Sequence, residues 1–230
     1  MAQRIVVLTG AGMSAESGIR TFRDADGLWE GHDVMEVASP EGWQRNRELV
    51  LQFYNDRRAQ LKEVEPNSAH KALVELEQRY HVSIVTQNVD NLHERAGSSN
   101  IIHLHGELSK SRSTLDEQLV YDCDGDIKIG DKCERGSQLR PHIVWFGEQV
   151  PMLQLAVHAV VSADIILIIG TSMQVYPAAG LVGYAQHNVP VYYVDPKPSI
   201  SYELTLRKNL HVIPEKATIG VRQVVDQLMV

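Results

Sequence analysis

Short apolar runs alternate with longer stretches of helical periodicity along most of the 230-residue chain. The apolar runs are rich in β-branched residues, as is typical of strands buried on both faces of a parallel sheet. The alternation therefore predicts βαβ units and an α/β fold with a Rossmann-like, doubly wound parallel sheet. The predicted strands cover 5–8, 82–85, 165–169 and 191–194, and the predicted helices cover 41–62, 67–79, 151–162, 177–187 and 217–229.

Two stretches interrupt this alternation. Residues 31–65 are mainly helical in pattern, and residues 107–142 are polar, weakly periodic and contain Gly and Asp. We expect both to be insertions that together form a smaller second lobe. The chain is then a single domain of 1–230, with a large lobe of 1–30, 66–106 and 143–230.

Charge and cysteine content narrow the functional class. The formal net charge of −7 is spread along the chain, which argues against a nucleic-acid-binding surface. The longest apolar run is too short to span a bilayer, and the first residues show no signal-peptide pattern. Two cysteines, Cys123 and Cys133, give no disulfide framework. We expect a cytoplasmic, monomeric protein that binds neither membrane nor nucleic acid.

A glycine-containing turn follows the first predicted strand. Gly10-Ala-Gly12 lies between that strand and a predicted helix, where glycine lets the backbone approach a pyrophosphate and helical N–H groups face it. A tight turn without a ligand explains this short pattern about equally well. The third glycine is Gly18, too late for the usual G-x-G-x-x-G, and this spacing disfavours an ordinary hydride-transferring dehydrogenase.

Polar residues follow the second predicted strand. Gln87, Asn88 and Asp90 lie at its carboxyl end, where ligands bind in open α/β sheets. Spacing alone favours a loop whose side chains satisfy their own backbone. His103 and His105, in a strand, would point to one face and suggest metal ligation, but no third ligand at a suggestive spacing accompanies them.

Five ordered segments resemble the sirtuin family, and together they cover nearly the whole chain. The resemblance rests on GAGMSAESGIRTFR at 10–23, TQNVDNLH at 86–93, LHG at 104–106, PHIVWFGE at 141–148 and GTS at 170–172. It implies a protein-lysine deacylase that consumes NAD and releases nicotinamide and an O-acyl-ADP-ribose. Acyl-lysine proteins or peptides would be its substrates.

The resemblance also implies roles for individual residues. His105 would be the catalytic base, a role that suits an imidazole titrating near neutral pH, with Asn88 and Asp90 in the catalytic set. Phe22 would cover the nicotinamide site and Arg23 would lie by the phosphates. Residues 144–147 would offer an edge on which the substrate peptide adds as a strand. The implied cofactor-binding residues are Gly10, Ala11, Gly12, Ser14, Ala15, Glu16, Ser17, Gly18, Thr21, Phe22, Arg23, Trp29, Gln87, Asn88, Val89, Asp90, Gly170, Thr171, Ser172, Asp195 and Ala217, and the implied substrate-binding residues are Tyr54, Arg57, Val144, Trp145, Phe146 and Gly147.

One arginine gives a clue to the acyl group. On a helical wheel of 43–61, Arg57 falls in the middle of an apolar arc, within reach of Tyr54. A snorkelling or ion-paired arginine is the commoner explanation of such a position. A guanidinium nevertheless suits bidentate binding of a carboxylate. A Tyr-x-x-Arg pair with the small Ala15 resembles the sirtuin subgroup that removes succinyl and malonyl groups.

The chain departs from the sirtuin pattern in two places. Most sirtuins hold a structural zinc with two Cys-x-x-Cys pairs, where this chain has Ser113 and Asp116, then Cys133 and Gly136. Because a closed zinc site needs about four N or S ligands, and Cys123 restores neither pair, we predict no structural zinc. The second departure is Asp195 in place of the usual asparagine. The aspartate carboxylate can still accept a hydrogen bond from a ribose hydroxyl.

Other functions stay open at this stage. A hydride-transferring oxidoreductase would generate NADH rather than nicotinamide. A mono-ADP-ribosyltransferase would use the same cofactor pocket. A catalytically silent module that binds NAD or acyl-lysine is disfavoured because Asn88 and His105 are both present.

Overall fold

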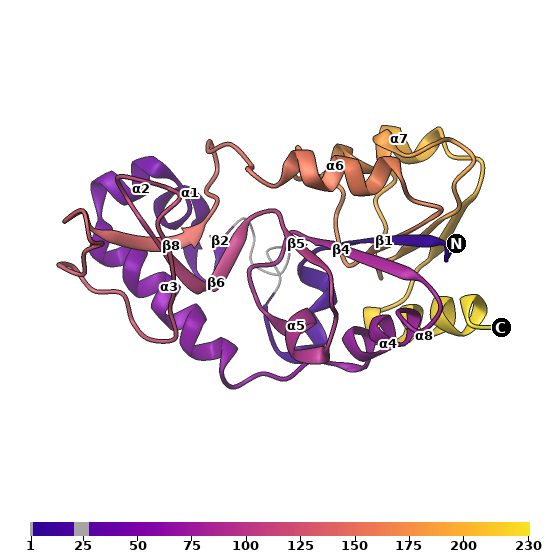
Figure 1. The fold of residues 1–230 in the computed structure, drawn as a ribbon, viewed down its shortest axis with the longest axis horizontal. Helices are drawn as coiled ribbons and strands as arrows, with labels where there is room; N and C mark the ends of the chain where they lie inside the picture. Colours follow the sequence, from indigo (N-terminus) through magenta and orange to yellow (C-terminus); the bar gives the residue numbers. More distant parts are fainter. Residues whose placement is uncertain (1, 21–27) are drawn as a thin grey trace.

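The computed structural model describes residues 2–20 and 28–230, which form a large and a small lobe (Figure 1). The large lobe contains a six-stranded sheet in the order β11-β10-β9-β1-β4-β5, and all of its neighbouring strands are parallel. The chain builds outward from β1 in one direction and then returns to build outward from β9 in the other, which is the Rossmann order. The predicted fold class is confirmed. The strands are β1 (Arg4–Thr9), β4 (His81–Thr86), β5 (Ile101–His103), β9 (Ile165–Ile169), β10 (Val191–Val194) and β11 (Leu210–Ile213).

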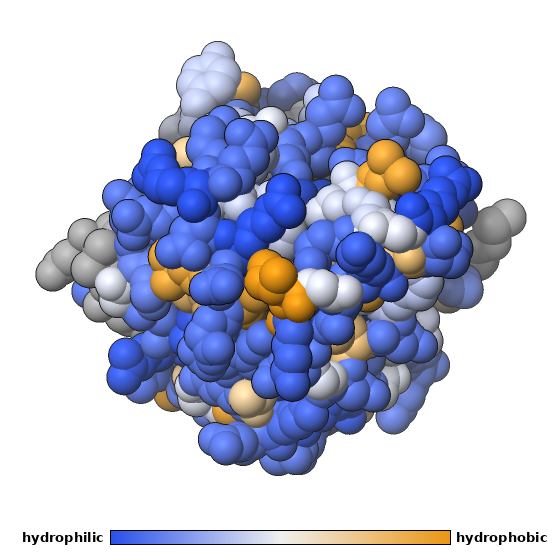
Figure 2. Space-filling view, turned by 90° about the vertical axis from the view of Figure 1, so that its left-hand side faces the viewer, coloured by the Kyte–Doolittle hydropathy of each residue, from blue (hydrophilic) through white to orange (hydrophobic). Residues whose placement is uncertain are grey.

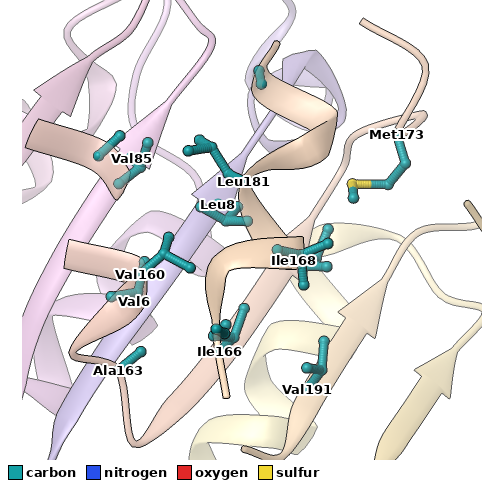
Figure 3. Packing of buried hydrophobic residues seen from close by; sticks show 14 of the residues in the cluster. Val6, Leu8, Val85, Val160, Ala163, Ile166, Ile168, Met173, Leu181 and Val191 are labelled. Carbon is teal, nitrogen blue, oxygen red and sulfur yellow. The ribbon is translucent and has the colours of Figure 1, made fainter. Parts of the chain in front are cut away.

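Helices cover both faces of this sheet (Figure 1). The helices α6 (Leu153–Val161) and α7 (Tyr202–Thr205) lie on one face with a 3-10 helix at Ala178–Tyr184, and α4 (Ser68–Leu76) and α8 (Ala217–Leu228) lie on the other. In β1, Val6 and Leu8 point into the first of these two cores and Ile5 and Val7 into the second. Figure 3 shows the first core, where Val6, Leu8 and Ile168 pack together. Burial on both faces explains the unbroken apolar run of β1.

The small lobe is formed by the two segments that interrupt the βαβ pattern. Its three-stranded antiparallel sheet has the order β7-β6-β8 and packs against helix α3. The lobe contains β2 (Leu28–Trp29), β3 (His32–Asp33), α1 (Val34–Val37), α2 (Pro40–Arg45), α3 (Arg47–Leu61), β6 (Gly106–Ser113), β7 (Val120–Asp122) and β8 (Leu139–Ile143). The helix α5 (Leu92–Ala96) and the 3-10 turns Ala11–Met13 and Ala15–Ser17 belong to the large lobe.

Two helices and several strands differ from the sequence-based predictions. The helix predicted at 41–62 is two helices, because Asn46 leaves the helical conformation at φ −150° and its side chain caps α3 by accepting from Leu49 N. The helix predicted at 177–187 is a 3-10 helix over Ala178–Tyr184. Strands β5 and β11 and the whole small sheet were not predicted. Their runs are short or polar, so local periodicity does not reveal them.

No helix among the described residues is long and apolar enough to cross a membrane. Figure 2 shows the end of the molecule formed by the small lobe, where hydrophilic side chains predominate and apolar ones are scattered. Scattered apolar side chains are normal on a protein surface. This face therefore does not indicate a docking site.

Candidate active site

A cavity of about 760 Å³ runs from the carboxyl end of the large sheet to the small lobe. Its walls include the loops that follow β1, β4, β9 and β10. The loops after β1 and β9 meet where the direction of sheet building reverses, which is where open α/β sheets bind ligands. The far end is lined by Tyr54 from α3 and by residues 143–148 after β8. Its volume falls in the upper part of the range of small-molecule and cofactor sites.

Glycines form the floor of the sheet end of this cavity. A Cβ on Gly10 would lie 2.8 Å from the carbonyl oxygen of Gly170, and one on Gly12 would lie 2.7 Å from the Gly170 Cα. Gly170 itself has φ +60°, a conformation that side chains disfavour. The Gly12 N–H donates to Gly170 O at 2.8 Å and locks the two loops together. The glycines thus let the two loops pack closely where both line the cavity, and a glycine-containing turn at this end of a parallel sheet fits the pyrophosphate of NAD.

A buried polar network lies beside the cradle. The Asn88 side-chain amide donates to Ser14 Oγ at 3.1 Å, and Ser14 Oγ donates to Asp90 Oδ2 at 2.9 Å. Leu92 N donates to the other carboxylate oxygen of Asp90 at 3.1 Å. Burial raises the pKa of the Asp90 carboxyl, and these hydrogen bonds oppose that rise. The network fixes Asn88 and Asp90 in place at the cavity wall.

His105 lies in the turn between β5 and β6, whereas His103 is the last residue of β5. Its Nδ1 contacts the carbonyl oxygen of Gln87 at 3.1 Å. A carbonyl only accepts, so Nδ1 carries the proton and Nε2 is left as an acceptor. Burial lowers the pKa of His105, and the bond to Gln87 only partly offsets this. His105 therefore lines the cavity as a neutral imidazole with a basic nitrogen.

Gln87 and Thr171 connect the loops on the two sides of β1. Gln87 Nε2 donates to Thr171 Oγ1 at 3.1 Å, and Tyr193 OH donates to Thr171 O at 2.8 Å. Further along, Asp195 Oδ1 accepts from Lys197 N at 2.8 Å. Lys197 and Lys216 also line the cavity and were missed from the sequence. Single lysines outside a motif carry no positional signal, which is why they were missed.

Most residues proposed for the cofactor line this cavity, with some exceptions. Ser17 and Gly18 are not among the lining residues, and Ser17 Oγ instead accepts from Asn67 Nδ2 at 3.1 Å. Glu16 lines the cavity, but its carboxylate accepts from Thr218 N and Oγ1 at the start of α8. Thr21, Phe22 and Arg23 lie outside the described residues. The proposed residues that do line the cavity are Gly10, Ala11, Gly12, Ser14, Ala15, Glu16, Trp29, Gln87, Asn88, Val89, Asp90, Gly170, Thr171, Ser172, Asp195 and Ala217.

At the far end, Tyr54 and Arg57 differ in their relation to the cavity. Tyr54 lines it, and its hydroxyl accepts from Trp145 Nε1 at 3.1 Å. Arg57 is not a lining residue; its guanidinium lies 4.3 Å from the Phe53 ring centre and donates to Phe53 O at 3.2 Å. Arg57 Nε is buried without a partner, and no carboxylate in the described residues lies within ion-pair distance of the guanidinium. Burial lowers the pKa of Arg57, and the charge of Glu30 opposes this.

Residues 144–147 also line the cavity, but the Trp145 side chain is buried in the protein. The backbone N–H groups of Val144, Trp145 and Phe146 all donate within the protein, to His105 O, Glu148 Oε2 and Ala38 O. A peptide adding here as a strand would have to pair with the remaining carbonyl groups and with Gly147. Strand addition at this edge stays a prediction.

Glu148 holds together a buried charge cluster that the sequence did not reveal. Its carboxylate accepts from Arg140 NH1 at 2.7 Å, from Arg112 NH2 at 3.1 Å and from Trp145 N at 2.8 Å. Burial alone would raise the pKa of Glu148, but the bonds and charge of Arg140 hold it below its usual value. Glu148 belongs to the PHIVWFGE segment, but its partner Arg112 is far away in sequence, so spacing gave no signal.

His103 belongs to a second polar cluster on the other side of Asn88. The sequence offered no third ligand beside the two histidines, yet ligand atoms of Glu94, His103 and Glu107 lie within 4.8 Å of one another. Lys110 Nζ contacts Glu107 at 2.7 Å, and His103 Nε2 contacts Glu94 at 2.6 Å. Burial lowers the pKa of His103, but the hydrogen bond and charge of Glu94 outweigh it, so the net shift is upward. The group behaves as an ion-pair cluster.

The degenerate cysteine region is held by hydrogen bonds. Ser113 Oγ accepts from Leu115 N at 3.0 Å and from Asp116 N at 3.3 Å, and it contacts Cys133 Sγ at 3.3 Å. Asp116 forms an ion pair with Arg135 at 3.0 Å. Two of the four positions that match the zinc pairs, Ser113 and Cys133, thus contact each other directly through their side chains. Within 113–136, no three potential metal ligands converge.

Two buried histidines behind the site should make stability depend on pH. His70 and His93 pack with ring centres 4.9 Å apart, and each has one buried ring nitrogen without a partner. Burial lowers the pKa of His70 from 6.5 to about 4 and that of His93 well below its usual value. Below pH 6.5 the unfolded chain therefore binds protons that the folded chain does not, so stability falls as the pH falls.

We expect His70 alone to remove about 3 kcal/mol of unfolding free energy between pH 7 and pH 4. Urea midpoints measured across this range should fall less steeply for His70→Gln. Glutamine can still accept from Asn67 N, as His70 Nδ1 does at 3.3 Å, so the helix cap is kept. The ion pair of His103 has the opposite pH dependence and is present in both proteins. Parallel pH curves for the two proteins would contradict the assignment.

Comparisons with known proteins place the chain in a family. The Sir2 family profile matches residues 10–177. A Helicobacter pylori (strain ATCC 700392 / 26695) protein named NAD-dependent protein deacylase is 56% identical over 227 residues, which cover 99% of this chain and 98% of that protein. A crystal structure of a Sir2 homologue with NAD has a TM-score of 0.87 and 39% identity, over 99% of this chain and 90% of the other. A Sir2 structure bound to acetylated peptide has a TM-score of 0.75 and 26% identity, over 99% and 92%. The chain belongs to the Sir2 family.

Proposed function

We propose that this chain is an NAD-dependent protein-lysine deacylase whose acyl pocket accepts succinyl and malonyl groups as well as acetyl groups. The observation that carries the proposal is that one cavity joins the glycine cradle, His105 and Tyr54. A dinucleotide at the cradle and an acyl-lysine entering from the small lobe would therefore meet beside His105. The deacylase activity is the one named for the Helicobacter pylori relative.

Different residues of the cavity have different chemical roles. When bound, NAD supplies an electrophilic ribose carbon, from which nicotinamide leaves, and it takes up the acyl group. The Gly10–Gly12 loop would hold the phosphates, and the Asn88–Ser14–Asp90 network would present fixed polar groups to the nicotinamide and its ribose. His105 accepts a proton at Nε2 from a hydroxyl brought against it, because its Nδ1–H is held by Gln87 O.

The far end of the cavity suits an acidic acyl group. Arg57 has a buried, unpartnered Nε and no ion-pair partner in the described residues, so a carboxylate would find an unused charge. Tyr54 lines the cavity one helical turn away on α3 and keeps a hydroxyl proton. Reaching a ligand would require Arg57 to leave the Phe53 ring, and side-chain rotamer changes of this kind are common on binding.

Arg57→Met should test the acidic-acyl part of this proposal. We expect desuccinylation to lose about tenfold to a hundredfold in kcat/KM, the range for a bond to a charged group, with much less change in deacetylation. Nicotinamide release from NAD, measured with matched succinyl-lysine and acetyl-lysine peptides, gives both rates. Arg47→Met, at an exposed arginine near the start of the same helix, is the matched control. An equal loss on both peptides would contradict the proposal.

We also propose that the small lobe needs no structural zinc and that the enzyme is a cytoplasmic monomer. The hydrogen bonds of Ser113 and the Asp116–Arg135 pair support the first point. Metal analysis of purified protein should find well below one zinc per chain, and a chelator should leave its melting temperature unchanged. One zinc per chain, lost together with stability on chelation, would contradict it.

A further inference from the structure

The Tyr54 hydroxyl accepts a hydrogen bond from a neighbouring side chain, which leaves its own proton available for donation. The side chain is fully buried, and its oxygen accepts from Trp145 Nε1 at 3.1 Å. An indole N–H can only donate, so the tyrosine must be the acceptor in this pair. Burial raises the pKa of Tyr54, which keeps the phenol protonated. Among the described residues no acceptor takes the phenolic proton, and Tyr54 lines the cavity.

Trp145 is itself held rigidly on several sides. The Arg140 guanidinium lies 3.2 Å from the centre of its ring, and Trp43 packs at 5.7 Å between ring centres. Its backbone N–H is bound to Glu148 at 2.8 Å, and Glu148 also binds Arg140. The Arg140 NH2 donates to Ile143 O at 2.9 Å, which ties the strand before Trp145 to the same cluster. The indole N–H direction is therefore set by the charge cluster.

We infer that Trp145 determines acyl specificity by fixing the Tyr54 hydroxyl as a hydrogen-bond donor toward the distal carboxylate of an acidic acyl-lysine. The inference rests on the proposed function. Without the indole N–H, the phenol can rotate and donate elsewhere, and the cavity loses a pre-oriented donor. An acetyl group has a methyl where the carboxylate would be, so it gains nothing from that donor. Trp145 acts through Tyr54 and is thus a positioning residue.

A double-mutant cycle with Trp145→Phe and Tyr54→Phe tests this. The quantity measured is the ratio of kcat/KM for a succinyl-lysine peptide to that for the matched acetyl-lysine peptide. We expect Tyr54→Phe to lower the ratio about tenfold or more and Trp145→Phe to lower it about fivefold. The double variant should match Tyr54→Phe alone, because the indole acts only through the hydroxyl. The loss in Trp145→Phe should lie in the KM of the succinyl peptide, with kcat kept.

Trp43→Phe is the matched control. It makes the same substitution, indole to phenyl, in the tryptophan that packs on Trp145, but it leaves the Trp145–Tyr54 hydrogen bond intact. It should keep the wild-type ratio, and thermal melting should show that each variant is folded. If the ratio depends on Tyr54 and Arg57 but not on Trp145, or if the two phenylalanine effects add, the inference fails and the proposed function stands. If the wild-type ratio depends on neither Tyr54 nor Arg57, the proposed acidic-acyl function fails, and the inference fails with it.

Discussion

His105→Ala should lower kcat/KM for deacylation by about a hundredfold to ten-thousandfold, the range for removing a general base. Among the described residues, His105 is the only histidine that lines the cavity, and Gln87 O holds its Nδ1–H so that Nε2 can accept a proton. Alanine removes this acceptor without adding bulk to the cavity. Release of nicotinamide from acyl-lysine peptide and NAD, followed under saturating and limiting peptide, measures the loss.

The matched control is His158→Ala, at an exposed histidine on α6. It should keep wild-type activity. The pH profile adds a second test, because burial lowers the pKa of His105 below the usual 6.5. A lowered pKa keeps the base neutral in mildly acidic solution, so the acid limb of kcat/KM should have its inflection below pH 6.5 in wild type. Full activity in His105→Ala, or an inflection clearly above 6.5, would contradict the assignment.

The sheet could be predicted because its determinants are local, whereas the cofactor end of the site was predicted only from the resemblance of its motifs to those of sirtuins. Strands buried on both faces produce apolar runs, and the loops that follow them carry the chemistry of the switch point. Gly10 and Gly12 follow β1 directly and pack against one other loop, at Gly170. Most of the residues assigned to the cofactor belong to short motifs at strand ends, and most of them line the cavity.

A small second lobe was predicted from the two stretches that interrupt the alternation, but its strands could not be predicted because their order comes from contacts distant in sequence. Strand β6 carries polar residues whose pairing with β8 spans a long insertion, so no period appears. Arg112 in β6 is buried and pairs with the partly buried Glu148 in the loop after β8. A buried arginine looks like a surface residue in sequence, and only its partner shows otherwise. Trp145 was predicted to bind the substrate peptide, which stays a prediction, but its hydrogen bond to Tyr54, 91 residues away in sequence, could not be predicted from spacing.

Glu148→Ala should cost about 3 to 5 kcal/mol of unfolding free energy, because it leaves two buried guanidinium groups without their carboxylate. The side chains of Arg112 and Arg140 are only 4% and 9% exposed. Each also has a buried Nε that lacks a partner, so no spare acceptor within the described residues is placed to compensate. Urea unfolding of wild type and variant at pH 7 measures the difference.

Glu117→Ala provides the matched control for this loss. Glu117 pairs with the same Arg112, but at 3.9 Å and with a side chain that is 73% exposed. Solvent screening leaves such a pair worth less than about 1 kcal/mol, so the control should unfold near the wild-type midpoint. Equal midpoints for Glu148→Ala and Glu117→Ala would mean that the cluster does not stabilise the lobe. A large gap between them would instead locate the stability of this lobe in the charges that hold Trp145 against Tyr54.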